Sequence, residues 1–312
     1  MATGTAKIDH DLTSNPIRRY KRSVNAIIGY LAITACSISL LPLASLAEHS
    51  PQRIVSVVPA LTEALFALGA KNQIVGVGSF DTVPTDSASL PRVGGLLDPD
   101  LEQILSLQPD LVVLYSSQSD LIEQLARAGI STFTYIHGGL ADSLSTLRTL
   151  GTTVGKGNEA QQLVDSITSE LNNLKVFLGG RPKPRALLVF GREPGSLRNI
   201  YASGGMGFLH DMLEAAGGLN ILTHVPRESI QLTSEAILAG APEVIIELTY
   251  DSRVNSDNQS AQLSAWNQLS AIPAVRNQRV HLLLGAHFLQ PGPRLAEATT
   301  AIAQALHPDI WP

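Results

Sequence analysis

Two glutamates occupy the same place in two copies of one sequence pattern. Glu102 and, 133 positions later, Glu235 each open Glu-x-Ile-Leu-x-x-x-Pro followed by an acidic residue and an aliphatic run. The pattern predicts a short helix that ends before the proline and leads into a buried strand. A carboxylate in a first helical turn also interacts favourably with the helix dipole, by about 0.3 to 1 kcal/mol. That effect accounts for each glutamate separately, whereas the matched spacing favours two acidic contacts that dock on a symmetric partner.

Aromatic and imidazole side chains follow several predicted strands. The carboxyl ends of strands are where open α/β sheets bind ligands. Rings at these positions would stack on a large flat ligand, or they would cap the core. An ordinary exposed loop position is the alternative for each histidine. The residues concerned are Phe80, Tyr115, His137 and His287.

Motifs for catalysis and for phosphate binding are absent from the sequence. It contains no GxxxxGK[ST] loop, no GxSxG elbow and no HExxH pair. Asp81 stands where a dinucleotide fingerprint beginning at Gly76 needs its third glycine, and the eight histidines lack the spacing of a metal site. The glycines before Gly207 form either a flexible helix entry or an anion cradle. We therefore expect no enzymatic activity, no catalytic residues, no cofactor and no metal.

The first 47 residues are typical of an export signal. Four basic residues between positions 18 and 22 precede an apolar run over 24–47, which ends with small residues at Ser45 and Ala47. An uncleaved anchor is the alternative, because about 20 apolar residues can span a bilayer. Cys36, the only cysteine, lies in a string that resembles a lipoprotein cleavage box. We expect a periplasmic protein whose signal peptide, 1–47, is cleaved, with a lipid anchor at Cys36 as the other possibility.

The remaining chain has the size and charge of a soluble two-domain protein. The chain has 312 residues, and its 44% hydrophobic content is enough for two cores. The leader carries five basic and two acidic residues, so removing its +3 from the net −5 leaves −8. An acidic body is unsuited to non-specific nucleic-acid binding, which depends on clustered lysine and arginine.

Alternating strand and helix patterns predict two α/β lobes with mostly parallel, Rossmann-like sheets. Between them, apolar residues over 159–178 recur at three- and four-residue steps and predict one long helix of roughly 30 Å. We therefore expect an N-terminal lobe over 51–157, a linking helix over 158–180 and a C-terminal lobe over 183–308. A cleft is expected between the lobes.

Strings spread over 51–308 resemble the helical-hinge class of periplasmic substrate-binding proteins. They are RIVSVVPALTE from Arg53, VGVGS from Val75, LPRVGGLLDPDLEQILSLQPDLVV from Leu90, the long helix, FGR at 190–192 and GPR at 292–294. This class serves ABC importers for cobalamin, haem and ferric siderophores, and the chain is most similar to its cobalamin binders. The resemblance implies two α/β lobes bridged by a single helix, a ligand held between them and little closure on binding.

The resemblance also implies partners and site residues. Glu102 and Glu235 would dock on arginines of the two subunits of a permease dimer, which works with its ATPase subunits and supplies the membrane contact. The cargo would be cobalamin or a related corrinoid, carried as a transported ligand; the alternative is haem or a ferric siderophore, with Tyr115, His137 or His287 recruited to iron. An α/β enzyme and a structural surface protein are rival classes that the motifs do not favour. The implied ligand-binding residues are Phe80, Leu96, Tyr115, His137, Arg192, His287 and Phe288.

Overall fold

The computed structural model describes residues 50–250, 254 and 259–311. The predicted signal peptide and Cys36 lie outside these residues. None of the helices in the described ranges combines the length and the apolar character needed to cross a bilayer.

The N-terminal lobe is built on a four-stranded sheet in the order β2-β1-β3-β4. All three strand pairings are parallel, as the alternation of strand and helix predicts. Pro59 begins α2, where its missing N–H removes no helical hydrogen bond. The strands are β1 Ile54–Ser56, β2 Ile74–Val77, β3 Leu111–Tyr115 and β4 Ser131–Tyr135, and the helices α2 Pro59–Ala67, α3 Leu101–Ser106, α4 Ser119–Arg127 and α5 Leu140–Thr153.

The C-terminal lobe contains a six-stranded sheet in the order β10-β9-β5-β6-β8, with β7 paired to β5. Strands β10, β9, β5 and β7 pair in parallel, whereas β6 pairs antiparallel with both β5 and β8. The strands are β5 Arg185–Gly191, β6 Ile200–Ser203, β7 Leu219–Asn220, β8 Ser229–Leu232, β9 Val244–Thr249 and β10 Val280–Leu284. The helices are α7 Phe208–Ala215, α8 Ser234–Gly240, α9 Gln259–Leu263, α10 Pro273–Arg276 and α11 Leu295–Leu306, with 3₁₀ turns η4 Ser264–Leu269 and η5 Ala286–Phe288.

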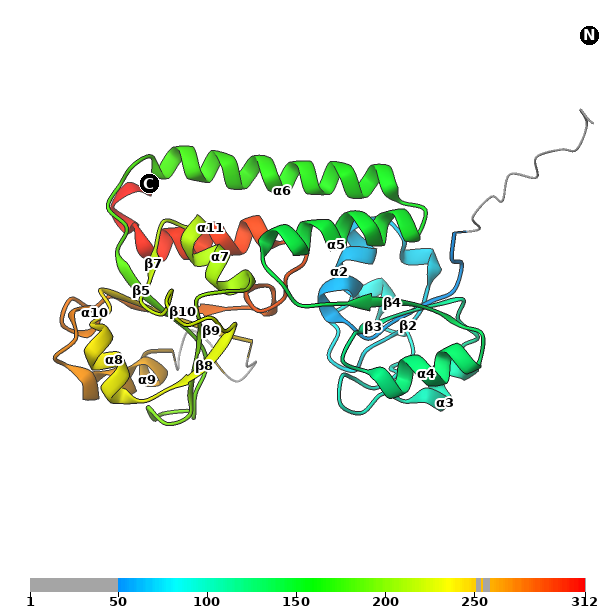
Figure 1. Ribbon diagram of the computed structural model, residues 1–312, viewed down its shortest axis with the longest axis horizontal. Coiled ribbons are helices and arrows are strands. Elements are labelled where there is room, and N and C mark those ends of the chain that lie inside the picture. Colours follow the sequence, from blue (N-terminus) through cyan, green and yellow to red (C-terminus); the bar gives the residue numbers. More distant parts are fainter. Residues whose placement is uncertain (1–49, 251–253, 255–258, 312) are drawn as a thin grey trace, which may run out of the picture. The chain divides into compact units, whose positions relative to one another are not determined.

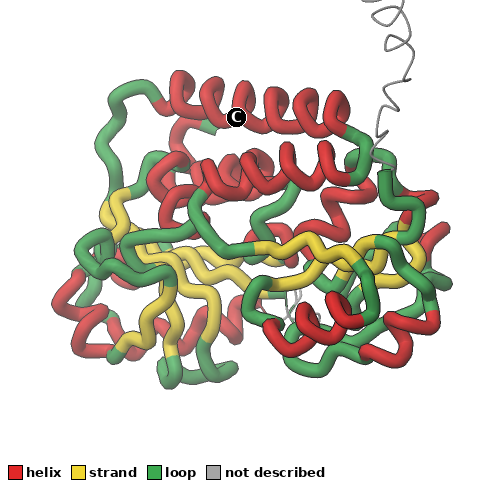
Figure 2. Tube along the Cα trace, turned by 45° about the vertical axis from the view of Figure 1, so that its right-hand side comes forward, coloured by secondary structure: helices red, strands yellow, loops and turns green. Residues whose placement is uncertain are grey.

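The long helix predicted from the apolar spacing is α6, which spans Gly157–Leu178. It follows the N-terminal sheet and precedes β5, and it lies over α5 and α11 (Figure 1). Figure 2 shows these helices, in red, on one side of the yellow strands. Helix α5 was not predicted from the sequence, because its polar serines and threonines obscure the apolar stripe that buries Leu147 and Leu150.

One apolar core runs through both lobes on the side that these helices cover. Strand alternation directs every second side chain to this side, for example Val113 of β3 and Leu188 of β5, both fully buried. Helices α2, α5, α6, α7 and α11 contribute the opposing side chains, including Ile167 of α6. Two separate cores lie on the other faces of the two sheets. The lobes are therefore joined by shared packing as well as by the chain of α6.

Two close contacts reinforce the packing between the lobes. Asp211 of α7 accepts a hydrogen bond from the backbone N–H of Leu140, at the start of α5, over 2.9 Å. Gly292, just before α11, packs so closely on α2 that a β-carbon there would lie 3.2 Å from the Ala60 carbonyl. Both contacts tie an element of the C-terminal lobe to one of the N-terminal lobe.

Because the lobes share a core, they should unfold together. In urea, the transition followed by far-UV circular dichroism should coincide with that followed by the fluorescence of Trp266 and Trp311, which lie in the C-terminal part of the chain. Replacing Leu188 by Ala should shift both transitions to lower urea by the same amount, with a loss of about 2–5 kcal/mol. Two separated transitions, only one of which responds to the substitution, would contradict a shared core.

Candidate functional site

A cavity of about 680 Å³ opens between the strand ends of the two lobes. Smaller cavities of about 290 Å³ and 370 Å³ adjoin it, since they share Thr249 and Val254 in one case and Tyr250 and Leu289 in the other. We call the three together the cleft. Residues that line its largest part are Val57, Pro59, Gly78, Ser79, Phe80, Asp81, Thr82, Gly95, Leu96 and Tyr115 from the N-terminal lobe, and Thr249, Tyr250, Val254, Leu284, Gly285, Ala286, Leu289 and Gln290 from the C-terminal lobe.

Three of the expected ligand residues line this largest part. Phe80 is 75% exposed and Leu96 43% exposed, which is unusual for large apolar side chains and leaves them available to a ligand. Phe80 lies over Gly95, where a β-carbon would come within 3.0 Å of its ring, so the glycine makes room for it. Tyr115 is partly buried at the end of β3. On the opposite wall Tyr250, 72% exposed, directly follows β9 and was not singled out from the sequence.

Tyr115 also belongs to an aromatic cluster with Tyr135 and His137. The Tyr115 and His137 rings stack with centroids 5.9 Å apart, and the Tyr135 ring meets His137 edge-on at 4.9 Å. The Tyr135 hydroxyl lies 3.4 Å from Nδ1 of His137. Burial raises the pKa of both tyrosines, so both phenols are neutral at physiological pH. His137 lines the 370 Å³ cavity, and the cluster therefore forms a wall of the cleft.

Gln118 holds the loop that carries Leu96. Its Oε1 accepts a hydrogen bond from the backbone N–H of Tyr115 over 3.0 Å, while its Nε2 donates to the carbonyls of Gly95 and Leu96 over 3.3 and 3.2 Å. The side chain is 8% exposed. Gln118 thus braces the cleft wall, with both its polar atoms engaged by the backbone.

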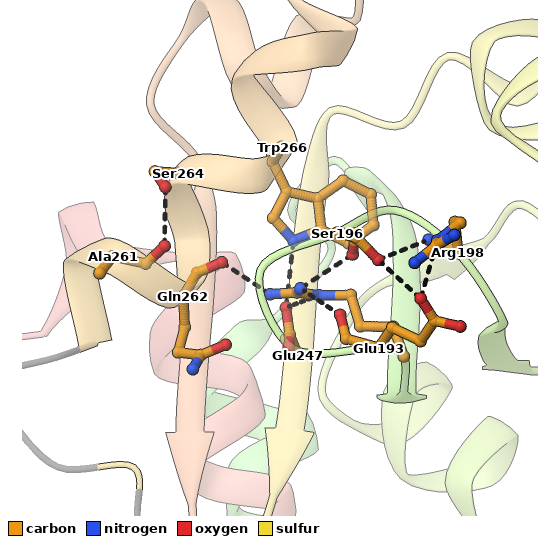
Figure 3. A network of polar contacts seen from close by, with 9 residues as sticks. Glu193, Ser196, Arg198, Glu247, Ala261, Gln262, Ser264 and Trp266 are labelled. Atoms are coloured by element: carbon orange, nitrogen blue, oxygen red, sulfur yellow. Dashed lines mark hydrogen bonds and ion pairs between the residues drawn. The ribbon is translucent and has the colours of Figure 1, made fainter.

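Arg192, expected as a ligand contact, lies in a buried network (Figure 3). Its Nε forms an ion pair with Glu247 Oε2 at 3.0 Å, and its side chain is 2% exposed. Trp266 Nε1 donates to the same oxygen, also over 3.0 Å. The remaining guanidinium nitrogens donate to the carbonyls of Glu193, Ser196 and Gln262. Because its donors are taken by protein acceptors, Arg192 supports the floor of the 290 Å³ cavity and is a poor candidate for direct ligand contact.

His287 and Phe288 do not line the cleft, contrary to the expectation. Turn η5 directs them toward α11: Phe288 is 4% exposed and joins the shared core, and the tilted ring of His287 contacts it with ring centroids 4.1 Å apart. His287 Nε2 lies 3.8 Å from Glu297 Oε1. Burial lowers the pKa of His287. Their neighbours Ala286 and Leu289 line the cavity instead.

The two repeated glutamates are exposed at the starts of equivalent helices. Glu102 lies in the first turn of α3, which Asp100 caps by accepting from the Gln103 N–H, and Glu235 lies in the first turn of α8, which Thr233 caps. Hydrogen bonds at this helix start lower the pKa of Glu235. In Figure 1, α3 and α8 both lie on the side of the sheets facing away from α6. The two helices that carry these glutamates, one from each lobe, thus lie on the same side of the protein.

A matched pair of arginines fixes these helices. Arg53 precedes β1 and donates from Nη2 to the carbonyl of Leu107, at the end of α3, over 2.6 Å. Arg185 begins β5 and donates from Nη2 to the carbonyl of Gly240, the last residue of α8, over 2.7 Å. The acidic residue of each repeat completes the unit, because Asp110 and Glu243 accept from the backbone N–H groups of the same two arginines. Each copy of the repeat thus has the same two contacts: an arginine side chain bonded to the end of a helix, and an acidic side chain bonded to the backbone of that arginine.

Asp81 is the one charged residue among those that line the largest part of the cleft. It is 6% exposed. Its Oδ2 accepts hydrogen bonds from Thr62 Oγ1 over 2.6 Å and from the Gly78 N–H over 2.9 Å. Burial raises its pKa to about 6, although the hydrogen bonds from Thr62 and Gly78 and the charge of Arg92 act in the opposite direction. The sequence had marked Asp81 only as a break in a glycine motif.

Comparison with known proteins assigns the fold and the class. The family model described as "Periplasmic binding protein" matches residues 54–284. The chain belongs to this family.

Relatives of this periplasmic binding protein cover most of its length. An uncharacterized ABC transporter substrate-binding lipoprotein of Bacillus subtilis is 29% identical over 85% of this chain and 82% of its own. A vitamin B12-binding protein of Salmonella paratyphi A is 27% identical over 83% and 91%. A periplasmic heme-binding protein of Pseudomonas aeruginosa, known as a crystal structure, is 26% identical, with a TM-score of 0.70 over 83% and 94%. The predicted two-lobed α/β fold and the substrate-binding class are therefore confirmed.

The buried carboxylate should make this periplasmic binding protein more stable in mild acid. The pKa of Asp81 is about 6 in the fold against an ordinary 3.8, so its proton stabilises the folded state below about pH 4, and this contribution is lost as the pH rises through 6. The shift corresponds to at most about 3 kcal/mol. In thermal unfolding, the midpoint temperature of wild type minus that of Asp81→Asn should be higher at pH 4.5 than at pH 7.5.

Asp165→Asn, at an exposed position on α6, is the matched control and should keep a constant difference from wild type over the same range. A wild-type midpoint that stays parallel to that of Asp81→Asn across these pH values would show that Asp81 titrates normally.

Proposed function

We propose that this periplasmic binding protein captures cobalamin or a related corrinoid in the cleft and delivers it to the permease of an ABC importer. The observation that carries the proposal is the charge of the cleft. Among the described residues that line its largest part, Asp81 is the one side chain of the Asp, Glu, His, Lys and Arg types, and it is a carboxylate. A corrinoid presents neutral amide side chains around a large ring, which suits such a wall. Haem carries two propionates and would need cations there.

The size and shape of the cleft support a large, flat cargo. A main cavity of about 680 Å³ with two adjoining ones lies within the range of small-molecule sites. Phe80, Tyr115 and Tyr250 provide exposed or half-exposed rings on both walls. Aromatic faces of this kind gain most from a ligand with an extended apolar face. The vitamin B12-binding relative is consistent with such a cargo.

Haem or a ferric siderophore is the second candidate. It is favoured by one observation, the Tyr115–Tyr135–His137 cluster, whose phenol and imidazole groups have the chemistry of iron ligands. The heme-binding protein of Pseudomonas aeruginosa supports it at a similar level of identity. The neutral phenols and the absence of a cation in the described lining of the main cavity count against it.

Delivery would use the two acidic helices. We infer that Glu102 and Glu235 dock on cationic residues of the two permease subunits. Both are exposed, and the helices that carry them are held by equivalent arginine contacts. Two ion pairs at a fixed separation supply orientation and encounter rate more than affinity. Export to the periplasm with cleavage after Ala47 belongs to the same proposal. A lipid anchor at Cys36 is the alternative to that cleavage, and the Bacillus relative named as a lipoprotein is consistent with it.

A titration panel tests the cargo. The protein should bind cyanocobalamin and cobinamide in isothermal titration, while haem and a ferric hydroxamate chelate should bind at least tenfold more weakly. Absorption spectra of the same mixtures identify any iron ligation independently. A Soret shift with haem, together with no heat from either corrinoid, would move the function to the second candidate.

A double variant tests the docking. Glu102→Gln with Glu235→Gln should slow association with the importer, reconstituted in lipid nanodiscs, at least tenfold, and each single variant should do so less. Cargo affinity should change by less than twofold, since both residues lie outside the cleft. Glu170→Gln is the matched control for each single variant, because it also removes one carboxylate charge, but from an exposed position on α6. Unchanged association kinetics for the double variant would exclude the two glutamates as docking contacts.

A further inference from the structure

One carboxylate oxygen at the wall of the cleft is buried without a hydrogen-bond partner. While Oδ2 of Asp81 accepts from Thr62 and Gly78, Oδ1 makes no hydrogen bond in the described structure. The residue is 6% exposed and lines the main cavity. A buried acceptor without a donor is destabilising, and native proteins rarely keep one without a use.

The rest of the carboxylate is held firmly from below. The Thr62 hydroxyl lies 2.6 Å from Asp81 Oδ2 and 2.7 Å from the Ser56 hydroxyl. Since a hydroxyl has one proton, Thr62 donates to the carboxylate and Ser56 in turn donates to Thr62. Both Ser56 and Thr62 are fully buried. This relay, running from β1 through α2, directs the carboxylate and leaves Oδ1 as its spare acceptor.

The charged and titratable groups that face the carboxylate do not neutralise it. Arg92, from the segment after β2, donates through Nη1 to the backbone carbonyls of Gly78 and Asp81 over 2.9 and 2.8 Å. Tyr115 of β3 faces Asp81 with a pKa raised by burial and by this carboxylate. The site is therefore built to keep a hydrogen-bond acceptor at the cleft without a counter-ion in contact.

We propose that Asp81 is the specificity-determining polar contact of the cleft, and that its Oδ1 accepts a hydrogen bond from an N–H or O–H group on the cargo. The terminal torsion of an aspartate is soft, so a small rotation would bring Oδ1 toward the cavity that Asp81 lines while Oδ2 stays within hydrogen-bond reach of Thr62 and Gly78. The proposal rests on the proposed function, in which primary amides of a corrinoid supply the donor. A cargo with carboxylates in place of these amides would be repelled.

Two consequences can be measured. Asp81→Asn keeps the shape of the side chain but presents an N–H₂ to the cavity once its oxygen serves Thr62 and Gly78, so two donors face each other. Protonation of wild-type Asp81 has a similar effect, and with a pKa of about 6 the ionised fraction falls to about a tenth at pH 5. Binding should weaken accordingly.

The experiment is calorimetric titration with cyanocobalamin and with cobinamide at pH 7.5 and pH 5.0. Wild type should lose about tenfold in affinity at the lower pH. Asp81→Asn should bind at least tenfold more weakly than wild type at pH 7.5 and show no pH dependence. Asp165→Asn should follow wild type throughout. Cobyrinic acid, which carries carboxylates where cobinamide carries amides, should bind wild type at least a hundredfold more weakly than cobinamide.

The outcomes separate the two proposals. Wild type that binds cyanocobalamin equally at both pH values, or with the same affinity as folded Asp81→Asn, would overturn the role of Asp81 and leave the function standing. Equal binding of cobyrinic acid and cobinamide would do the same without any variant. Wild type that binds neither corrinoid would overturn the proposed function, and the role of Asp81 with it.

Discussion

The constraint on which this structure depends is the apolar core that its two lobes share. Strands from both sheets direct alternate side chains, such as Val113 and Leu188, into one volume closed by α5, α6, α7 and α11. Separating the lobes would expose that volume to water, which is unfavourable by roughly 25 cal/mol for each Å² of apolar surface. We therefore expect the walls of the cleft, on the far side, to keep a nearly fixed separation.

If the walls of the cleft do not move, the choice of cargo depends on the side chains that line it. Exposed rings at Phe80 and Tyr250 leave apolar surface in water when the cleft is empty, and covering it favours any broad apolar face without choosing among them. Choice requires polar groups that are satisfied by one cargo and left unpaired by another. Gln118 and Arg192 are occupied by the protein itself, whereas Asp81 keeps one oxygen without a partner, and this is why we propose it as the group that discriminates.

Much of the fold was predictable because its signals are local. The long helix predicted over 159–178 is found as Gly157–Leu178, and Phe80, Leu96, Tyr115 and His137 do line the cleft. The antiparallel strands β6 and β8 carry weak patterns and depend on pairing between distant segments. The direction in which His287 and Phe288 point depends on how η5 meets α11, and the partners of Arg192 come from three separate segments. Such contacts leave no periodic trace in a single sequence.

The paired arginine contacts have an evolutionary consequence. Arg53 and Arg185 hold α3 and α8 through main-chain carbonyls, which every residue has whatever its side chain. These contacts therefore do not depend on the side chains at the outward-facing positions of the two helices. Substitution there can proceed without loosening either lobe. If α3 and α8 dock on a permease as proposed, a few substitutions on their outward-facing positions would change the partner while the residues of the cleft stay the same.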